Sequence, residues 1–190
     1  VSRDGRIYLH DDTNRAPGLK KALEAGQYKS LTIAFPFNDP RLFVQQRFVL
    51  YSATKLLAYG DERAIHVIEE TKGKDPLHIR YVAGTDDYDK VVRRCNVAVS
   101  VYFVLAEWGG DGPQVVFPDG FGFYRLRFTS RNSSRSLKQA LDYVTKFTYG
   151  RIAGLPLELS LDYPERSDST GIRRKVPVWR FLMRPPERFA

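Results

Sequence analysis

The chain contains one cysteine, one methionine and three histidines among its 190 residues. A single cysteine, Cys95, excludes an intramolecular disulfide, and so few histidines and cysteines leave no set with the spacing of zinc ligands. No apolar run approaches the roughly 20 residues that a membrane-spanning helix needs. We therefore expect a reducing, cytoplasmic setting, no metal and no membrane partner.

The sequence also lacks the signatures of common enzymes. It has no GxxxxGK[ST], no GxGxxG and no HExxH, and no pair of acids has an evident reason to meet. The polar groups at 10–12 and 86–89 could hold a hard cation, but a turn and a helix start explain them better. We predict no cofactor and no catalytic residues, and these absences argue against an enzyme without deciding the question.

Positive charge and aromatic rings are abundant. The 30 Lys and Arg exceed the 22 Asp and Glu, which gives a formal charge of +8 and a pI near 9.6. Such a surplus favours a polyanionic partner, most often a nucleic acid. Tyr and Phe are numerous and 43% of residues are hydrophobic, so the composition predicts an ordered, strand-rich chain with one substantial core.

Hydrophobic periodicity and turn residues predict the order of the elements. Segments 31–37, 64–70, 79–82, 97–108, 121–129, 155–163 and 175–183 are expected to be strands, and 17–25, 86–94 and 134–148 helices. Segment 43–51 fits either a strand or a helix. The pattern indicates an α+β fold, with a mixed, mostly antiparallel sheet, two or three helices and ferredoxin-like elements in the C-terminal half.

This pattern is compatible with a single α+β domain over 1–190. An alternative division gives sub-lobes at 18–94 and 95–184, preceded by an arm at 1–17. Turns are expected at 109–113 and 117–120, and an extended tail at the C-terminal end.

The segment 121–153 carries the most informative chemistry. Arg125 and Arg127 alternate with apolar residues and should face outward from a strand. The next turn leads into a helix, whose free N–H groups and dipole favour an anion. Its candidate nucleic-acid-binding residues are Arg131, Asn132, Ser133 and Arg135. The alternatives are that Asn132, Ser133 or Ser134 only caps the helix, and that the strand arginines are an ordinary solvated face.

A second basic cluster consists of Arg173, Arg174 and Lys175. It lies at the end of the polar segment 164–174, which also contains Arg166. Clusters of this kind track a phosphate backbone, although solubility explains them equally. Cys95 follows two arginines, which could lower the pKa of its thiol, but a small buried cysteine at a strand start is the simpler interpretation.

Three stretches resemble a known family: FPDGFGFYRLRFTSRNSSRSL, TYGRIAGLPLELSL and RRKVPVWRF. Over residues 121–178 the chain is similar to phage and mobile-element proteins that include recombination directionality factors. The resemblance implies a non-enzymatic protein that binds a large serine integrase on DNA and redirects synapsis from integration to excision. Some members carry several cysteines that suggest a metal site; this chain has only Cys95, so no metal ligand is carried over.

Two other functions remain open. The β-α-β-β order is compatible with an RNA-binding module of a CRISPR-type ribonucleoprotein, in which a sheet face and basic loops hold RNA. A phosphate-handling enzyme is the third alternative. The expected partners are therefore a nucleic acid, with DNA favoured over RNA, and a protein such as a recombinase.

Overall fold

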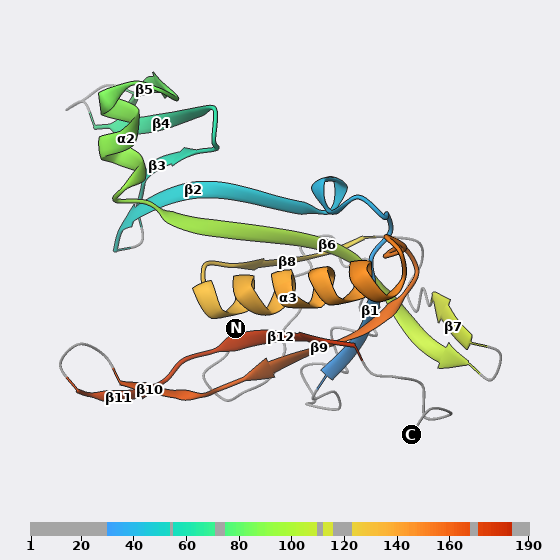
Figure 1. Cartoon of the computed structure of the whole chain (residues 1–190). Helices are drawn as coiled ribbons and strands as arrows, with labels where there is room; N and C mark the ends of the chain where they lie inside the picture. The colour runs from blue at the N-terminus through green and yellow to red at the C-terminus, as the bar shows by residue number, and fades with distance from the viewer. Residues whose placement is uncertain are drawn as a thin grey trace. The chain divides into compact units, whose positions relative to one another are not determined.

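The computed structural model describes residues 30–53, 55–70, 75–109, 112–115, 123–167 and 171–183 (Figure 1). The chain divides into two compact units. Within the described residues, the first unit comprises 30–43, 101–126 and 130–183, and the second comprises 44–100 and 127–129. Strand β6 (Asn96–Gly109) contributes residues to both units.

The first unit is built on three antiparallel strand pairs. Strand β9 (Pro156–Asp162) pairs with β1 (Ser30–Ala34) on one side and with β12 (Val178–Leu182) on the other, and β1 also pairs with β6. Strand β7 (Gly112–Val115) forms a hairpin with the end of β6. Consecutive residues of β6 from Phe103 to Ala106 are buried, as expected for a strand that is covered on both faces.

Two smaller parts complete this unit. A 3-10 turn, η1 (Pro40–Leu42), precedes Phe43, whose ring stacks on Phe35 with centroids 4.4 Å apart. Strands β10 (Glu165–Ser167) and β11 (Arg173–Lys175) form a separate two-stranded ribbon.

Helix α3 (Arg131–Phe147) covers the outer edge of the first unit's sheet. Its buried stripe, Leu137, Ala140, Leu141 and Val144, has the three- and four-residue spacing of an amphipathic helix. Figure 1 shows α3 lying alongside β12, the strand at the end of the sheet order. The hydroxyls of Ser133 and Ser136 accept hydrogen bonds from the backbone N–H groups of Trp179 and Phe181, at 3.0 and 3.1 Å. Two helix side chains therefore satisfy donors that an edge strand would otherwise leave unpaired.

The second unit contains a four-stranded antiparallel meander. Strands β2 (Val44–Ser52), β3 (Lys55–Gly60), β4 (Ala64–Glu69) and β5 (Leu77–Val82) pair in chain order. Helix α2 (Asp86–Val92) is capped by Thr85 and packs on β4 and β5, where Tyr88 joins Ala58 and Ile65 in the core of this unit. Since the helix covers one face of the meander, alternate residues of the strands are left on the other face.

The fold class is confirmed: the described residues form an α+β protein with a mostly antiparallel sheet and two α-helices. Residues 44–52 are a strand, and the expected hairpin of 64–70 with 79–82 is present as β4 and β5. The helix expected from 134 begins three residues earlier, at Arg131, because Ser130 is its N-cap. The expected arm 1–17, helix 17–25, turn 117–120 and C-terminal tail lie outside the described residues.

Several short elements were not predicted. Strands β3 and β7 and the turn η1 were missed, and the polar segment before Arg173, expected to be a loop, contributes β10 to the ribbon. Elements this short carry too few residues for a clear hydrophobic alternation in the sequence.

Candidate nucleic-acid interface

Strand β8 (Tyr124–Phe128) presents its arginines to solvent. Burial alternates along it, with Arg125 and Arg127 exposed, Tyr124 and Leu126 half-buried and Phe128 buried. The Arg127 guanidinium donates to the hydroxyl of Tyr51 at 3.5 Å, which is a weak contact at an exposed position. The expected outward face of this strand is therefore present, and it offers two guanidinium groups to an anion.

The start of α3 offers two further arginines. Ser130 caps the helix, with its hydroxyl accepting from the N–H of Ser133 at 3.4 Å. Arg131 and Arg135 are exposed and one helical turn apart, so they lie on the same face, while Asn132 is half-buried. The N-cap is thus Ser130 and not one of the three candidates Asn132, Ser133 and Ser134. The exposed side chains of Arg131 and Arg135 are available to an anion.

Ser133 occupies a structural position. Its side chain is fully buried, and its hydroxyl accepts from Trp179, 46 residues further along the chain. A nucleic acid could reach this hydroxyl only by separating α3 from β12. We therefore leave Ser133 out of the proposed surface and assign it to the edge of the sheet.

The second basic cluster lies on the two-stranded ribbon. Arg173, Arg174 and Lys175 form β11 and are exposed, and Arg174 pairs in register with Arg166 of β10. Successive side chains of a strand point to opposite faces. A partner bound to one face of the ribbon therefore contacts either Arg174 or the pair Arg173 and Lys175.

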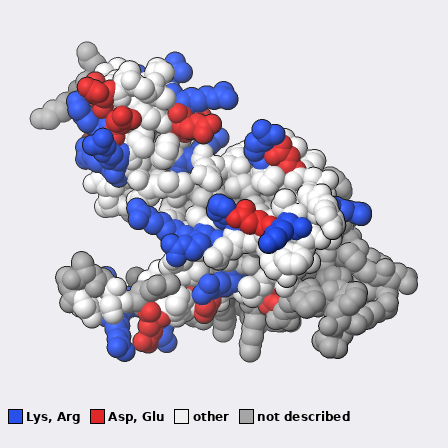
Figure 2. Space-filling model, in the orientation of Figure 1, with Lys and Arg blue, Asp and Glu red and all other residues white. Residues whose placement is uncertain are grey.

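On the face that Figure 2 shows, Lys and Arg side chains are interleaved with acidic ones. The positive charge can therefore act on an anionic partner in two ways, through the net field of the protein and through local groups of two or three cations.

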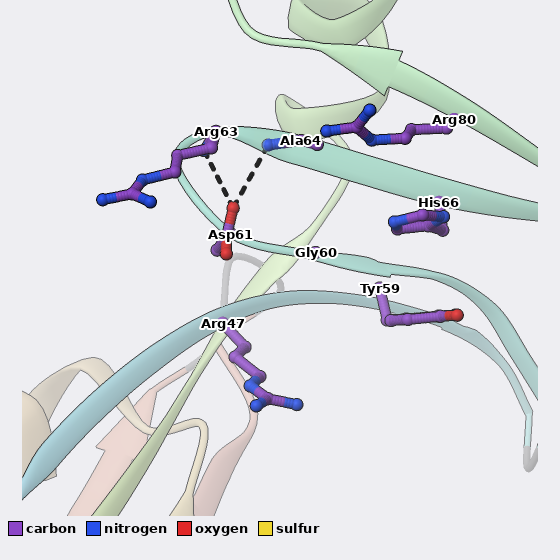
Figure 3. Close-up of a pocket in the computed structure, with 8 residues that line it drawn as sticks. All are labelled: Arg47, Tyr59, Gly60, Asp61, Arg63, Ala64, His66 and Arg80. Atoms are coloured by element: carbon purple, nitrogen blue, oxygen red, sulfur yellow. Dashed lines mark hydrogen bonds between the residues drawn. The ribbon is translucent and has the colours of Figure 1, made fainter.

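Sequence reasoning missed a pocket of about 360 Å³ in the second unit. All four strands of the meander, and the turn between β3 and β4, contribute to it (Figure 3). Its lining residues are Arg47, Tyr59, Gly60, Asp61, Arg63, Ala64, His66 and Arg80. Three guanidinium groups surround this space against a single carboxylate.

The turn between β3 and β4 is held by Asp61. One oxygen of its carboxylate accepts from the N–H groups of Arg63 and Ala64, at 2.9 and 3.1 Å, as Figure 3 shows. These two hydrogen bonds hold the pKa of the Asp61 carboxyl below its usual range, with smaller contributions from the charges of Arg63 and Arg47. The backbone C=O of Asp61 accepts from the hydroxyl of Tyr88 at 2.9 Å, which ties the turn to α2.

One wall of the pocket is aromatic. Tyr59 and His66 are opposite residues on β3 and β4, and their rings stack with centroids 5.2 Å apart and planes 14° apart. His78 meets Tyr59 edge-on at 6.5 Å, and Arg80 pairs in register with His66. The two rings therefore lie side by side on the face of the meander opposite α2, with Arg80 next to His66.

Other chemistry is sparse in the part of the chain that the structure describes. No group of three or more metal-ligating side chains occurs there, and neither helix has the length and apolar run needed to cross a bilayer. Burial raises the pKa of the Cys95 thiol, and the charge of Arg94 opposes this shift. This burial arises because Cys95 packs against the core of the second unit.

Together, the described residues define a basic α+β protein that presents arginines on a strand, at a helix start, on a ribbon and around one pocket. A family model described as Gp3-like, recombination directionality factor-like, matches residues 6–183, and the chain belongs to this family. Searches of the curated proteins and of the solved structures find no match. Membership supports an accessory role in phage DNA recombination and a general association with a recombinase and DNA.

Proposed function

We propose that this protein is an accessory factor of a serine integrase, which binds the integrase on DNA and favours excision over integration. The family match over residues 6–183 carries the proposal, because it spans both units and connects the chain to recombination directionality. Of the three functions that the sequence left open, this is the one that the match favours.

An exposed aromatic group supports a protein partner. Tyr143 and Phe147 lie one turn apart on α3, are 51% and 60% exposed, and have ring centroids 4.3 Å apart. Tyr149, just beyond the helix, is fully exposed. Aromatic side chains are enriched among the residues that dominate binding energy at protein interfaces. We assign this group, Tyr143, Phe147 and Tyr149, to the integrase contact.

Replacing Tyr143 and Phe147 with alanine is expected to weaken integrase binding by about thirtyfold or more, because even one aromatic hot-spot residue contributes about 2 kcal/mol. Stability should change little, since both rings are exposed. Co-purification and surface plasmon resonance with the cognate integrase measure the effect. Phe37→Ala removes a ring that is 43% exposed elsewhere in the first unit and is the matched control. Unchanged affinity of the double variant would remove this face from the proposal, and no association of the wild-type protein at micromolar concentration would refute the integrase partnership.

For DNA, the triple variant Arg125→Ala, Arg127→Ala, Arg131→Ala tests the exposed cations of β8 and α3. Each lost phosphate contact lowers the slope of log affinity against log salt by about 0.9, so the slope should fall by about 2.7 if all three residues contact phosphate. Gel shift with duplex DNA at several salt concentrations measures it. The control variant Lys90→Ala, Arg93→Ala, Arg94→Ala removes equal charge at α2. Equal losses in both variants would mean that only net charge matters, and no loss would make the three arginines a solvated face.

A further inference from the structure

We propose that the pocket of the second unit, lined by Arg47, Arg63, Arg80, Tyr59 and His66, binds a nucleotide unit of an unpaired nucleic-acid strand. This site is separate from the arginines of β8 and α3 and does not depend on integrase. Its ligand class follows from three features of the pocket: its cations, its aromatic wall and its size.

The cations form no ion pair with a carboxylate of the described residues, although the charge of Asp61 acts on Arg63 and Arg47 at longer range. Among the described residues, no carboxylate lies within 4.0 Å of the guanidinium groups of Arg47, Arg63 or Arg80. The single acid of the lining, Asp61, is engaged by two backbone N–H groups of its own turn. Guanidinium groups that line a concave space and form no ion pair with a described carboxylate favour an oxyanion, and their planar, forked donors suit phosphate.

The aromatic wall and the volume extend the ligand beyond a bare ion. The stacked pair Tyr59 and His66 is half-buried and borders the same space as the arginines, as Figure 3 shows. About 360 Å³ falls in the range of small-molecule sites, roughly 300–1,000 Å³, and is far larger than one phosphate requires. Aromatic side chains interleaved with arginine are typical of proteins that hold unpaired bases together with their phosphates.

The chain keeps this space open by local means. Gly60 lines the pocket and, having no Cβ, lies close against the backbone of Ala64 and Ile65, while the Asp61 turn holds Arg63 at the rim. Arg47 and Arg80 come from β2 and β5, the two outer strands of the meander, and lie on opposite sides of the Tyr59 and His66 rings in Figure 3. A phosphate in the pocket would meet donors from both sides, which is the arrangement expected for binding of one nucleotide of a longer strand.

Fluorescence anisotropy with a labelled 12-residue oligothymidylate tests the proposal. The variant Arg47→Ala, Arg80→Ala should weaken binding by about a hundredfold and lower the salt slope by about 1.4, since each phosphate contact on a single strand contributes about 0.7. Tyr59→Leu should weaken binding about tenfold. The control Arg93→Ala, Arg94→Ala removes two exposed arginines from the same unit without touching the pocket and should change affinity less than about twofold. Equal loss in pocket and control variants, or no loss in either, overturns the proposal.

Competition identifies the ligand class. Unlabelled oligothymidylate should displace the probe, thymidine monophosphate should displace it more weakly, and inorganic phosphate at the same concentration should have less effect than the monophosphate. Equal competition by inorganic phosphate would reduce the site to a simple anion site, and equal competition by polyglutamate of matched charge would assign it to an acidic protein segment. In the wild-type protein, the NMR signals of the Gly60 amide and the His66 ring should shift on adding the oligonucleotide, and unmoved signals would contradict the proposal without any variant.

Discussion

The double variant Ser133→Ala, Ser136→Ala is expected to lose about 3 kcal/mol of unfolding free energy. Each substitution removes the hydroxyl that accepts from a backbone N–H of β12, at about 1–3 kcal/mol, and alanine's better helix propensity returns about 0.5 kcal/mol per site. Both hydroxyls belong to residues that are at least 93% buried, so water cannot readily replace them. Urea unfolding followed by the fluorescence of the tryptophans, one of which is Trp179 on β12, measures the loss.

A matched double variant separates this effect from helix propensity. Ser134→Ala, Gln139→Ala also increases alanine content on α3, but neither side chain bonds to β12, and the hydroxyl of Ser134 donates instead to the C=O of Ser130. Its stability should stay within about 0.5 kcal/mol of wild type. In hydrogen exchange, the amides of Trp179 and Phe181 should lose protection only in the first variant. Equal stability of the two double variants would show that the helix hydroxyls contribute nothing to holding the edge strand.

This arrangement explains one limit of sequence reasoning. The letters TSRNSSR before an apolar run predict a helix start correctly, because Ser and Asn there satisfy free N–H groups. They do not distinguish a capping serine from one that faces a distant strand. Ser130 caps the helix and Ser133 reaches Trp179, and that difference depends on tertiary packing between segments 46 residues apart.

The strand before α3 was predictable for a physical reason. In 124–128, one face is buried and the other solvated, so apolar and basic residues alternate and fix both the strand and the direction of Arg125 and Arg127. The same logic fails at β3. Its sequence KLLAYG does not alternate clearly, since Leu56 and Leu57 are both half-buried and a bulge interrupts the pairing with β2 at Leu50.

Missing β3 also concealed the pocket. His66 and Arg80 are partners in the predicted β4–β5 hairpin, but Arg47 joins them only because β3 lies between β2 and β4. Without that strand, Arg47 is an isolated basic residue in the sequence, while Arg173 to Lys175 stand out as a run. A basic cluster that is contiguous in the chain can therefore be recognised from the sequence. A site assembled from four strands can be recognised only once the order of those strands is known.

Gly60→Ala is expected to destabilise the second unit by about 3 kcal/mol, the upper end of overpacking costs, because the clash is with backbone. A Cβ at this position would lie 2.2 Å from the C=O oxygen of Ala64 and 2.6 Å from the Cα of Ile65. That same oxygen accepts from the N–H of Asp61 at 2.9 Å, so relieving the clash also opens the turn at the pocket.

The matched control is Gly84→Ala in the same unit. Gly84 has a positive φ of 88° and open space around its Cβ position, so its substitution costs only the left-handed backbone strain, about 1–2 kcal/mol. Hydrogen-exchange mass spectrometry on peptides from 55–69 should show earlier opening for Gly60→Ala than for Gly84→Ala, and oligonucleotide affinity should fall in the first alone. If the Gly60→Ala protein were no less stable than the Gly84→Ala protein, β3 and β4 would move apart at little cost in free energy. The close approach of β3 and β4 would then not be what fixes the shape of the pocket.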